Sequence, residues 1–401
     1  MKNILEKFIE KLFTISGFVT SIAILLVVFF LFSGGINLFR SSAVEDGFIV
    51  VVNRENPVNR LTPLDLKDIF DHEITDWSSY GWDNQEEGSS QAILVFRIND
   101  ITNYFSDEEL GEEHEFVPAL INQLIAENRG IIAFIPLEYA TAGFSGKKID
   151  VGNITLSQVF GGEEWIPTAT PAPLFGILPL IAGTLWVSLI AILIALPFGL
   201  SVAIYMSEVS GIRIRNALKP IVELLSGIPS VVYGFFGLVV IVPLIQQIFK
   251  LPVGETGLAG SIVLAIMALP TIITVSEDAM RNCPRAMREA SLSLGANKWQ
   301  TVCKVVIPYS RSGIVAGVVL GIGRAIGETM AVLMVTGNSA VIPYTIVQPL
   351  RTIPATIAAE LGEAPAGGAH YQALFLLGVI LFVITLIVNT SVEYISAKNK
   401  S

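Results

Sequence analysis

The stretch Gly317–Thr336, GVVLGIGRAIGETMAVLMVT, carries only two charged residues, Arg324 and Glu328. It has about the 20 residues that a helix needs to cross a bilayer, and a spacing of four residues predicts that both charges lie on one helix face. A charge inside a membrane span costs about 3 kcal/mol on insertion scales, so it usually faces a protein interior or a solute path. Arginine is a planar, permanent cation suited to an oxyanion. The residues alone leave two interpretations of this face open: part of a solute path that suits an oxyanion, or a structural ion pair of Arg324 with Glu328.

The whole chain has the composition of a membrane protein with several spans. Of its 401 residues, 52% are hydrophobic and only 15% are charged, against about 25% charged in soluble domains. Six apolar runs are each about as long as a span; they cover residues 14–38, 177–206, 219–249, 257–276, 313–337 and 371–395. We therefore predict an all-α polytopic fold with six transmembrane helices and a small α/β insertion between the first and the second. No A-x-A-like cleavage site follows the first run, so we expect a retained span and not a signal peptide.

Charge is unevenly distributed along the chain. Residues 41–173 hold 23 acidic and 7 basic residues, a net charge of −16; since the total is −10, the remainder carries +6. The loops on one side of the apolar runs are poor in positive charge, and most flanking basic residues lie on the other side: Lys2, Lys7, Lys11, Arg213, Arg215, Lys219, Arg281, Arg285, Arg288, Lys298, Lys304, Arg311, Lys398 and Lys400. The positive-inside rule then predicts that both termini lie in the cytoplasm and the acidic insertion outside. Both cysteines lie outside the insertion, which excludes a disulfide framework there.

The insertion has the pattern of a small α/β unit over residues 47–150. Runs rich in aliphatic residues predict buried strands at 48–52, 92–96 and 131–135. A helix is predicted over 61–70, with Thr62 as N-cap and proline in its first turn, and another over 117–127. The Pro- and Thr-containing segment 167–173 cannot continue a helix, and we expect it to be a linker to the membrane core.

The loop between the fourth and fifth runs, residues 277–311, contains a spaced motif. Glu289-Ala290-Ser291 is followed after three residues by Gly295, and nine residues later by Val305-x-Ile307-Pro308. This pattern resembles the EAA coupling loop of ABC-transporter permeases, with serine in place of the third alanine. We expect residues 281–294 to form a short helix that Gly295 ends in a left-handed turn and that lodges in a groove on a soluble partner. The resemblance implies that Glu289, Ala290, Gly295 and Pro308 couple the chain to an ATPase; an ordinary basic loop is the alternative.

Three further segments narrow the resemblance. They are residues 175–184 (FGILPLIAGT), 227–234 (GIPSVVYG) and 323–332 (GRAIGETMAV), the last followed by Thr336-Gly337-Asn338. Over residues 174–395 the chain is similar to the permeases of high-affinity phosphate importers, the PstC type in particular. That resemblance implies ATP-driven phosphate import by alternating access, with Arg324 as the phosphate-interacting residue and Glu328 on the same face.

The same resemblance implies partners and cofactors. The chain has no P-loop, so ATP and Mg would be bound by a separate dimer of ATP-binding subunits, and the chain itself would be a transport subunit without a cofactor, a metal or an enzyme activity. A second permease subunit, of the PstA type, would complete the path. An extracytoplasmic phosphate-binding protein would deliver the anion. The chain would lie among the lipids of the cell membrane and have no nucleic-acid partner.

The insertion shows a second resemblance. Leu61-Thr62, Ile69-Phe70, residues 74–77 (ITDW), Arg97 and residues 130–135 (GIIAFI) are similar to a stretch of phosphate-binding proteins. In that family a Ser-Gly-Thr phosphate loop follows the arginine, whereas residues 98–105 here read INDITNYF. A β-branched residue cannot replace a glycine whose backbone must approach an anion closely. We therefore expect a degenerate lobe that docks, gates or assembles at the external mouth, or an inert accretion.

The chain is thus expected to have three parts: residues 1–40 with the first span, the insertion and its linker at 41–173, and the permease core at 174–401. Two other functions stay open. One is an ABC permease for another oxyanion, sulfate or molybdate. The other is a membrane-anchored extracytoplasmic phosphate sensor or receptor, against which the uninterrupted coupling loop and the six spans argue.

Overall fold

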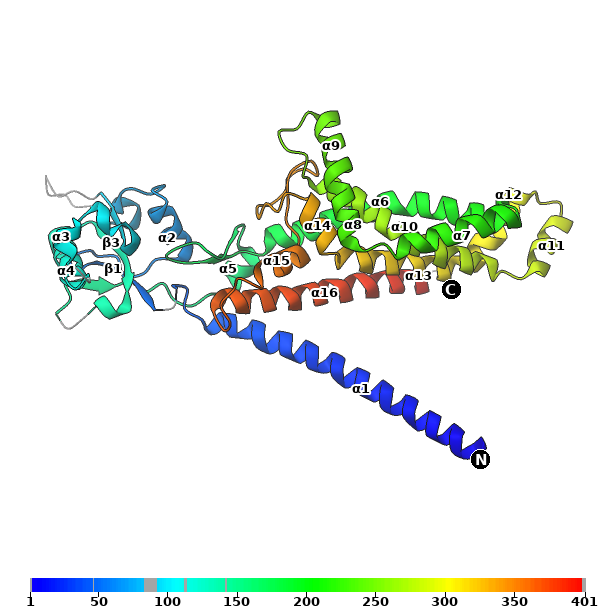
Figure 1. Cartoon of the computed structure of the whole chain (residues 1–401), viewed down its shortest axis with the longest axis horizontal. Coiled ribbons are helices and arrows are strands. Elements are labelled where there is room, and N and C mark those ends of the chain that lie inside the picture. Colours follow the sequence, from blue (N-terminus) through cyan, green and yellow to red (C-terminus); the bar gives the residue numbers. More distant parts are fainter. Residues whose placement is uncertain (1, 46, 83–91, 112–113, 141–142, 399–401) are drawn as a thin grey trace. The chain divides into compact units, whose positions relative to one another are not determined.

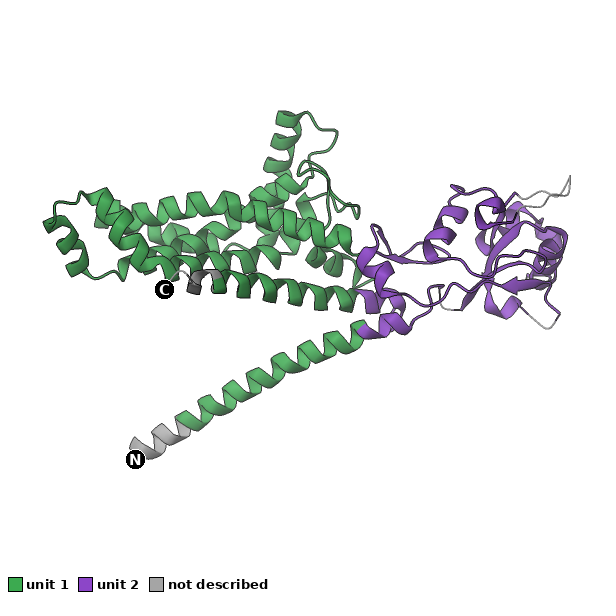
Figure 2. Ribbon diagram, turned by 180° about the vertical axis from the view of Figure 1, so that it is seen from behind, with its two compact units in different colours: residues 1–35, 177–364, 374–401 green, residues 36–176, 365–373 purple. Residues whose placement is uncertain are grey.

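A computed structural model describes residues 2–45, 47–82, 92–111, 114–140 and 143–398. Lys400, counted above among the basic residues, lies outside this description. The chain falls into two compact units (Figure 2). The helical unit comprises residues 1–35, 177–364 and 374–401, and the α/β unit comprises residues 36–176 and 365–373.

The helical unit contains the long apolar helices (Figure 1). It holds all or most of each of the following elements: α1 (Lys2–Ile36), α6 (Leu178–Ile204), α7 (Ile212–Ser226), α8 (Ser230–Phe236), α9 (Val242–Phe249), α10 (Gly257–Arg281), α11 (Arg285–Ser293), α12 (Lys298–Thr301), α13 (Ile307–Ile326), α14 (Met330–Val335), α15 (Ile353–Glu360) and α16 (Ala369–Lys398). One π-helical turn extends α6 to Val209, and two others join α8 to α9 and α12 to α13.

Six segments of the described chain are long and apolar enough to span a membrane. They are Glu10–Arg40, Leu178–Val209, Ser230–Phe249, Gly257–Arg281, Lys298–Ile326 and Ala369–Val392. The predicted number of spans is confirmed, but two bounds are wrong. The third span begins at Ser230 and not near 219, because Pro229 has no backbone N–H and separates α7 from α8. The fifth runs from Lys298 to Ile326 and not from 313 to 337, because Asn297 caps it early and it ends before Gly327.

Helix α10 forms the centre of the helical unit and packs against α6 and α13. In its most apolar window 61% of the residues are buried, compared with 39% or less in the other five spans. Glycines permit this close packing: a Cβ at Gly199 of α6 would lie 2.8 Å from Ile272 of α10, and one at Gly313 of α13 would overlap Ala279. Small residues therefore serve helix contact here, as expected for helices that pack within lipid.

The α/β unit is built on a four-stranded sheet with the strand order β2-β3-β1-β4. The strands are β1 (Phe48–Asn53), β2 (Leu94–Arg97), β3 (Ile131–Pro136) and β4 (Gly146–Lys148). β1 pairs antiparallel with β3 and β4, and β2 pairs parallel with β3. Side chains from one face of the sheet, Ile49 and Val51 among them, pack with Ile121 and Ile125 of α4 (Val117–Glu127) in one core.

The three predicted strands and both predicted helices of this unit are confirmed. Helix α2 (Pro63–Phe70) begins with a capping box in which the Thr62 side chain accepts from the Asp65 N–H and the Asp65 carboxylate accepts from the Thr62 N–H. The prediction of a linker at 167–173 is wrong, because this segment joins β5 (Trp165–Ile166) to β6 (Leu174–Phe175), which pair antiparallel. Strand β4 and helix α5 (Leu156–Gly161) were also not predicted.

Candidate functional site

Arg324 lies in the last turn of α13, and the helix ends two residues later at Ile326. The Gly327 N–H donates to the Gly323 carbonyl at 3.2 Å, and α14 begins only after Glu328 and Thr329. The expectation that Arg324 and Glu328 share one face of a continuous helix is therefore wrong. Gly327 contributes to the break, because glycine costs about 0.5–1 kcal/mol relative to alanine inside a helix.

The two charges at this break make separate contacts. Within the described chain no ion pair joins Arg324 to Glu328. The Glu328 Oε1 instead accepts a long hydrogen bond, 3.5 Å, from the Ala331 N–H in the first turn of α14. Arg324, half-buried, lies at the carboxyl end of α13, where the helix dipole favours a cation. Among the described residues, no ion pair or hydrogen bond engages the Arg324 guanidinium.

A second interrupted helix packs beside the first. Helix α7 ends at Ser226, and α8 begins at Ser230 after Gly227, Ile228 and Pro229. The Tyr233 hydroxyl of α8 donates to the Leu225 carbonyl of α7 at 2.8 Å and so bridges the break. The break at residues 227–229 lies just before the third span, and the break at residues 327–329 lies just after the fifth.

Helices α8 and α14 lie against each other with little room between them (Figure 1). A Cβ at Gly234 of α8 would lie 2.8 Å from the Met334 sulfur and 2.9 Å from the Ala331 Cα of α14. The structure thus brings the segment 227–234 and the segment 323–332, nearly 100 residues apart in sequence, into one site.

A cavity of about 500 Å³ adjoins the α13–α14 break. Its lining is apolar apart from Thr329 and backbone groups, and comes from Gly327, Thr329, Pro354, Ile357, Ala358, Leu361, Gly362 and Leu381. Neither Arg324 nor Glu328 is among these residues. This cavity therefore offers no cation to an anionic ligand.

The loop motif folds largely as expected. Helix α11 covers Arg285–Ser293, and Gly295 follows it with φ +86°. The Gly295 N–H donates to the Leu292 carbonyl at 3.0 Å and the Ala296 N–H to the Ser291 carbonyl at 3.2 Å, the two bonds of a Schellman motif. The left-handed turn is confirmed. The predicted start at 281 is wrong, because Arg281 ends α10 and Pro284 lies before the new helix.

The outer surface of this loop is exposed and partly apolar. Glu289, Ala290 and Gly295 are exposed, and Pro308 lies in the first turn of α13. Four large apolar side chains beside them are also exposed: Met287, Leu292, Leu294 and Trp299, with Leu294 89% exposed. Ser291, the substituted position of the motif, bonds the Thr301 hydroxyl of α12 at 3.0 Å and so helps to hold α11 against α12.

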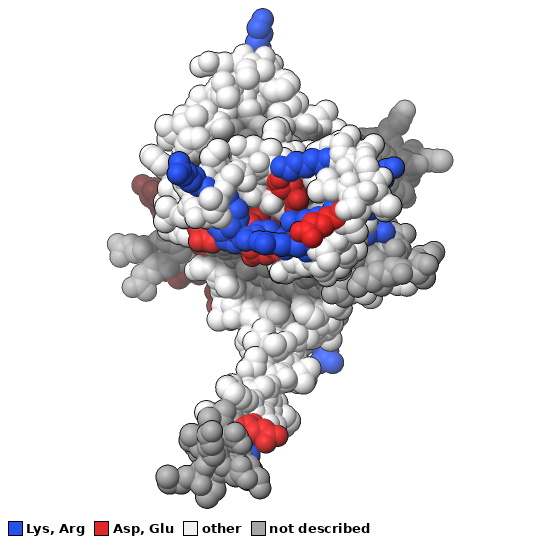
Figure 3. Space-filling model, turned by 90° about the vertical axis from the view of Figure 1, so that its right-hand side faces the viewer, with Lys and Arg blue, Asp and Glu red and all other residues white. Residues whose placement is uncertain are grey.

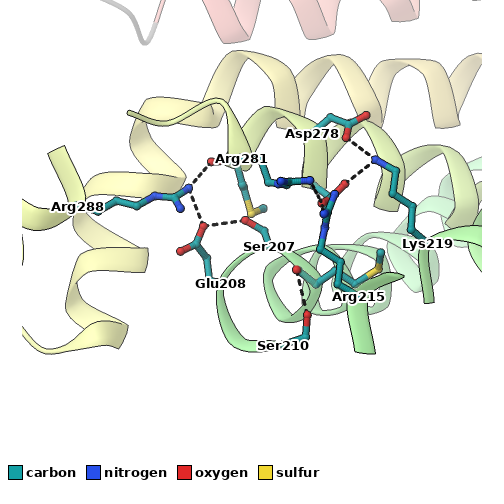
Figure 4. Close-up of polar contacts among 11 residues, drawn as sticks. Ser207, Glu208, Ser210, Arg215, Lys219, Asp278, Arg281 and Arg288 are labelled. Atoms are coloured by element: carbon teal, nitrogen blue, oxygen red, sulfur yellow. Dashed lines mark hydrogen bonds and ion pairs between the residues drawn. The ribbon is translucent and has the colours of Figure 1, made fainter. Parts of the chain in front are cut away.

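A cluster of ion pairs lies at the same end of the helical unit, where lysines and arginines gather on the surface (Figures 3 and 4). Its centre is Glu277 of α10, whose side chain is 1% exposed. Arg215 Nε lies 2.8 Å from Glu277 Oε1, and Lys219 Nζ lies 3.2 Å from Oε2 and 2.8 Å from Asp278 Oδ1. Arg281 is 3.8 Å from the same Oε1. The hydrogen bond to Asp278 raises the pKa of Lys219.

Sequence reasoning missed this cluster. Breaking a buried pair by removing one partner costs about 3–5 kcal/mol, so these side chains fix α7 against α10. The sequence held one signal for the cluster, the acidic residue Glu277 at the end of an apolar run. A carboxylate that becomes buried there needs cationic partners. Arg215 and Lys219, four residues apart, were visible as one helix face, but their partner lies about 60 residues away.

In the α/β unit, Arg97 is already engaged. Its Nη2 donates to the Phe70 carbonyl at 2.6 Å, and its guanidinium lies 5.3 Å from the centre of the Phe70 ring. The following residues, Ile98–Asn103, form a 3₁₀ helix containing Asp100. A cavity of about 550 Å³ in this unit is lined by Glu163, Glu164 and mostly apolar or small residues, without a lysine or arginine among them. These features do not form an oxyanion site.

Comparison with known proteins gives matches over both parts of the chain. Residues 195–401 match the family model described as "Binding-protein-dependent transport system inner membrane component". Residues 31–173 match the model described as "PBP superfamily domain".

The alignments with individual relatives cover most of each relative's length. The chain is 41% identical over 237 residues to the probable ABC transporter permease protein YqgH of Bacillus subtilis, covering 59% of this chain and 76% of that protein. It is 39% identical over 251 residues to the phosphate transport system permease protein PstC of Mesorhizobium japonicum, covering 58% and 76%. For PstC 1 of Mycobacterium tuberculosis the identity is 38% over 239 residues, covering 54% and 71%.

Proposed function

Because the chain belongs to the family of binding-protein-dependent transport system inner membrane components, we propose that it is the permease subunit of an ATP-driven phosphate importer. The similarity to PstC permeases supports phosphate as the substrate. The observation that carries the proposal within the molecule is Arg324, a half-buried cation in the last turn of the fifth span, next to the break between α13 and α14. A fixed guanidinium within a membrane span suits an oxyanion.

The two breaks support an alternating-access mechanism. Helices α7–α8 and α13–α14 are each interrupted, and their second halves pack on each other at Gly234. Broken helices of transporters present the ends of half-helices to substrate near the bilayer midplane. Arg324 would hold the anion during its passage, and Glu328, at the start of the next half-helix, would set the charge of the path when it is empty. Opening to either side would follow from rearrangement around these breaks.

Coupling to ATP hydrolysis would occur at α11. The exposed Met287, Leu292 and Leu294 side chains around Glu289 and Ala290 suit a groove on an ATP-binding subunit dimer. Gly295 and Pro308 would hold the shape of the loop. ATP and Mg would be bound by that partner, and this chain would supply no cofactor site.

Further partners and the orientation follow from the same proposal. A PstA-type permease would complete the path, and a phosphate-binding protein would deliver the anion from outside. The basic loops and both termini would face the cytoplasm, and the acidic α/β unit would be extracytoplasmic. Since Arg97 is bound to the Phe70 carbonyl, that unit would dock or assemble partners and would not bind phosphate as its relatives do.

The test is uptake of labelled phosphate by a strain that lacks this chain, with and without the chain restored. We expect restoration to recover phosphate uptake and to leave sulfate uptake, the control, unchanged. Recovery of sulfate or molybdate uptake in place of phosphate would assign another oxyanion. Affinity purification adds a second measurement: an associated ATPase supports transport, whereas an associated kinase or regulator without uptake would mean a sensor.

A further inference from the structure

Arg288 of α11, the residue before Glu289, joins three elements of the helical unit. Its Nη2 donates to Glu208 Oε1 at 2.9 Å and to the Met280 carbonyl at 2.8 Å (Figure 4). Glu208 lies in the π-helical turn that continues α6, and Met280 lies in the last turn of α10. One side chain therefore ties the loop helix to the ends of two long core helices.

This contact is sheltered from solvent on the carboxylate side. The Glu208 side chain is 9% exposed and that of Arg288 is 24% exposed. The Ser207 hydroxyl donates a second hydrogen bond to Glu208 Oε1, at 2.7 Å, which helps to fix the carboxylate. A charge-assisted bond in such a setting is stronger than an exposed surface pair, which contributes little.

The positions 288 and 289 have opposite surroundings. Consecutive residues on an α-helix are about 100° apart, given 3.6 residues per turn. Glu289 is exposed, whereas Arg288 reaches the helix ends beneath α11. A partner that moves the exposed surface of α11 would therefore move Arg288 with it.

The helix ends that Arg288 holds are in turn connected to α13. Met280 packs with Ala203 of α6, Cys283 and Val306 in one buried cluster. The Ser310 hydroxyl of α13 donates to the Ala279 carbonyl of α10 at 3.0 Å. From Ser310, α13 runs without a break to the turn that carries Arg324.

We propose that Arg288 is a positioning residue that transmits movement of α11 to the ends of α6 and α10, and so to α13. The inference rests on the proposed function and adds the contacts through which movement of α11 would reach α13. The Ser291–Thr301 bond cannot take this role, because it joins α11 only to α12. In the described chain, Arg288 is the α11 side chain bonded to both core helices.

The experiment measures phosphate transported per ATP hydrolysed by the complete transporter in proteoliposomes. The variants are Arg288→Gln, Glu208→Gln, both together, and Arg288→Lys. We expect each glutamine variant to lower the ratio about tenfold, the effect of losing one hydrogen bond to a charged group. The double variant should lose no more than either single one, because both remove the same interaction. Arg288→Lys should retain part of the ratio, since it keeps a charged donor.

Arg213→Gln is the matched control. It removes an exposed arginine from α7 and should leave the ratio unchanged. An unchanged ratio in assembled Arg288→Gln transporter would overturn the inference, and so would losses that multiply in the double variant. If Arg288→Gln fails to assemble, the test uses Glu208→Gln and Arg288→Lys, and an unchanged ratio in both assembled variants would overturn the inference. Wild-type transporter that hydrolyses ATP without moving phosphate contradicts the proposed function, whereas normal import with unaltered ratios contradicts the role of Arg288 alone.

Discussion

Arg324 combines a permanent charge with a place at the end of an interrupted helix. The helix dipole of α13 favours a cation there, and within the described residues no carboxylate is paired with it. A cation without a fixed partner can bind an anion without first breaking an ion pair. This makes the anion role of Arg324 stronger than the alternative of a structural pair with Glu328.

Replacement of this arginine should therefore strongly lower transport without unfolding the chain. We expect Arg324→Gln to lower phosphate uptake at least about tenfold, the effect of losing one charged hydrogen bond, while the complex still assembles. Arg324→Lys should retain partial uptake, because it keeps the charge but loses the planar fork. Uptake rates and co-purification of the subunits are the measurements. Normal uptake by the glutamine variant would remove Arg324 from the path.

Glu328 should act independently of Arg324. In a double-variant cycle of Arg324→Gln and Glu328→Gln, residues in direct contact show coupling of about 0.5–3 kcal/mol, and separate ones add. Since Glu328 contacts the Ala331 N–H instead, we expect additivity within about 0.5 kcal/mol. The cycle is measured on uptake rates of variants that retain measurable transport, with Arg324→Lys replacing Arg324→Gln if uptake is too low. Strong coupling would restore the ion-pair interpretation.

At the scale of elements, α11 depends on the turn that ends it. A Cβ at Gly295 would meet nothing within 4 Å, so the cost of substitution comes from the backbone at φ +86°. A left-handed conformation costs an ordinary residue about 1–2 kcal/mol, and less for asparagine.

We expect Gly295→Val to unwind the end of α11 and to lower phosphate-stimulated ATP hydrolysis by the assembled transporter. Gly295→Asn is the control, because asparagine accepts the left-handed turn and should stay close to wild type. Measurements of ATPase activity with and without phosphate compare the two. Equal activity of both variants would show that the turn is not needed for coupling.

At the scale of the whole molecule, the distribution of basic residues predicts the orientation of the chain. Cys283 is buried, whereas Cys303 is exposed and lies in the first turns of the fifth span, so a membrane-impermeant maleimide reports on this end of the span through Cys303. We expect labelling in inside-out vesicles and none in intact spheroplasts. A Cys303→Ser variant serves as the control for the site. Labelling of intact spheroplasts at Cys303 would reverse the orientation.

The α/β unit has a core of its own, so its loss should leave the helical unit able to fold. We expect deletion of residues 47–165 to slow phosphate uptake at low phosphate while the subunits still assemble. Arg97→Gln should not change the affinity, because Arg97 is bound to the Phe70 carbonyl. Uptake at varied phosphate concentration measures both. Unchanged affinity and rate after the deletion would leave the unit without a docking role.

Local features of this protein could be predicted from its sequence. The six spans follow from apolar runs of sufficient length, and helix α2 follows from Thr62 and Pro63 at its start. The Schellman turn at Gly295 follows from a glycine after an amphipathic segment. The membership of the transport family, expected from the coupling loop, is confirmed by the match over residues 195–401. In each case the cause lies within a few residues of the effect.

Other features were decided only by tertiary structure. The end of α13 before Glu328 looked like continuous helix, since the whole stretch is apolar enough to span. The hairpin of β5 and β6 around residues 167–173 looked like a linker. Glu277 with Arg215, and Glu208 with Arg288, are joined across 62 and 80 positions of sequence. Neighbouring residues determine helix length, caps and turns, whereas the partners of a buried charge depend on which helices pack together, and no local pattern contains that information.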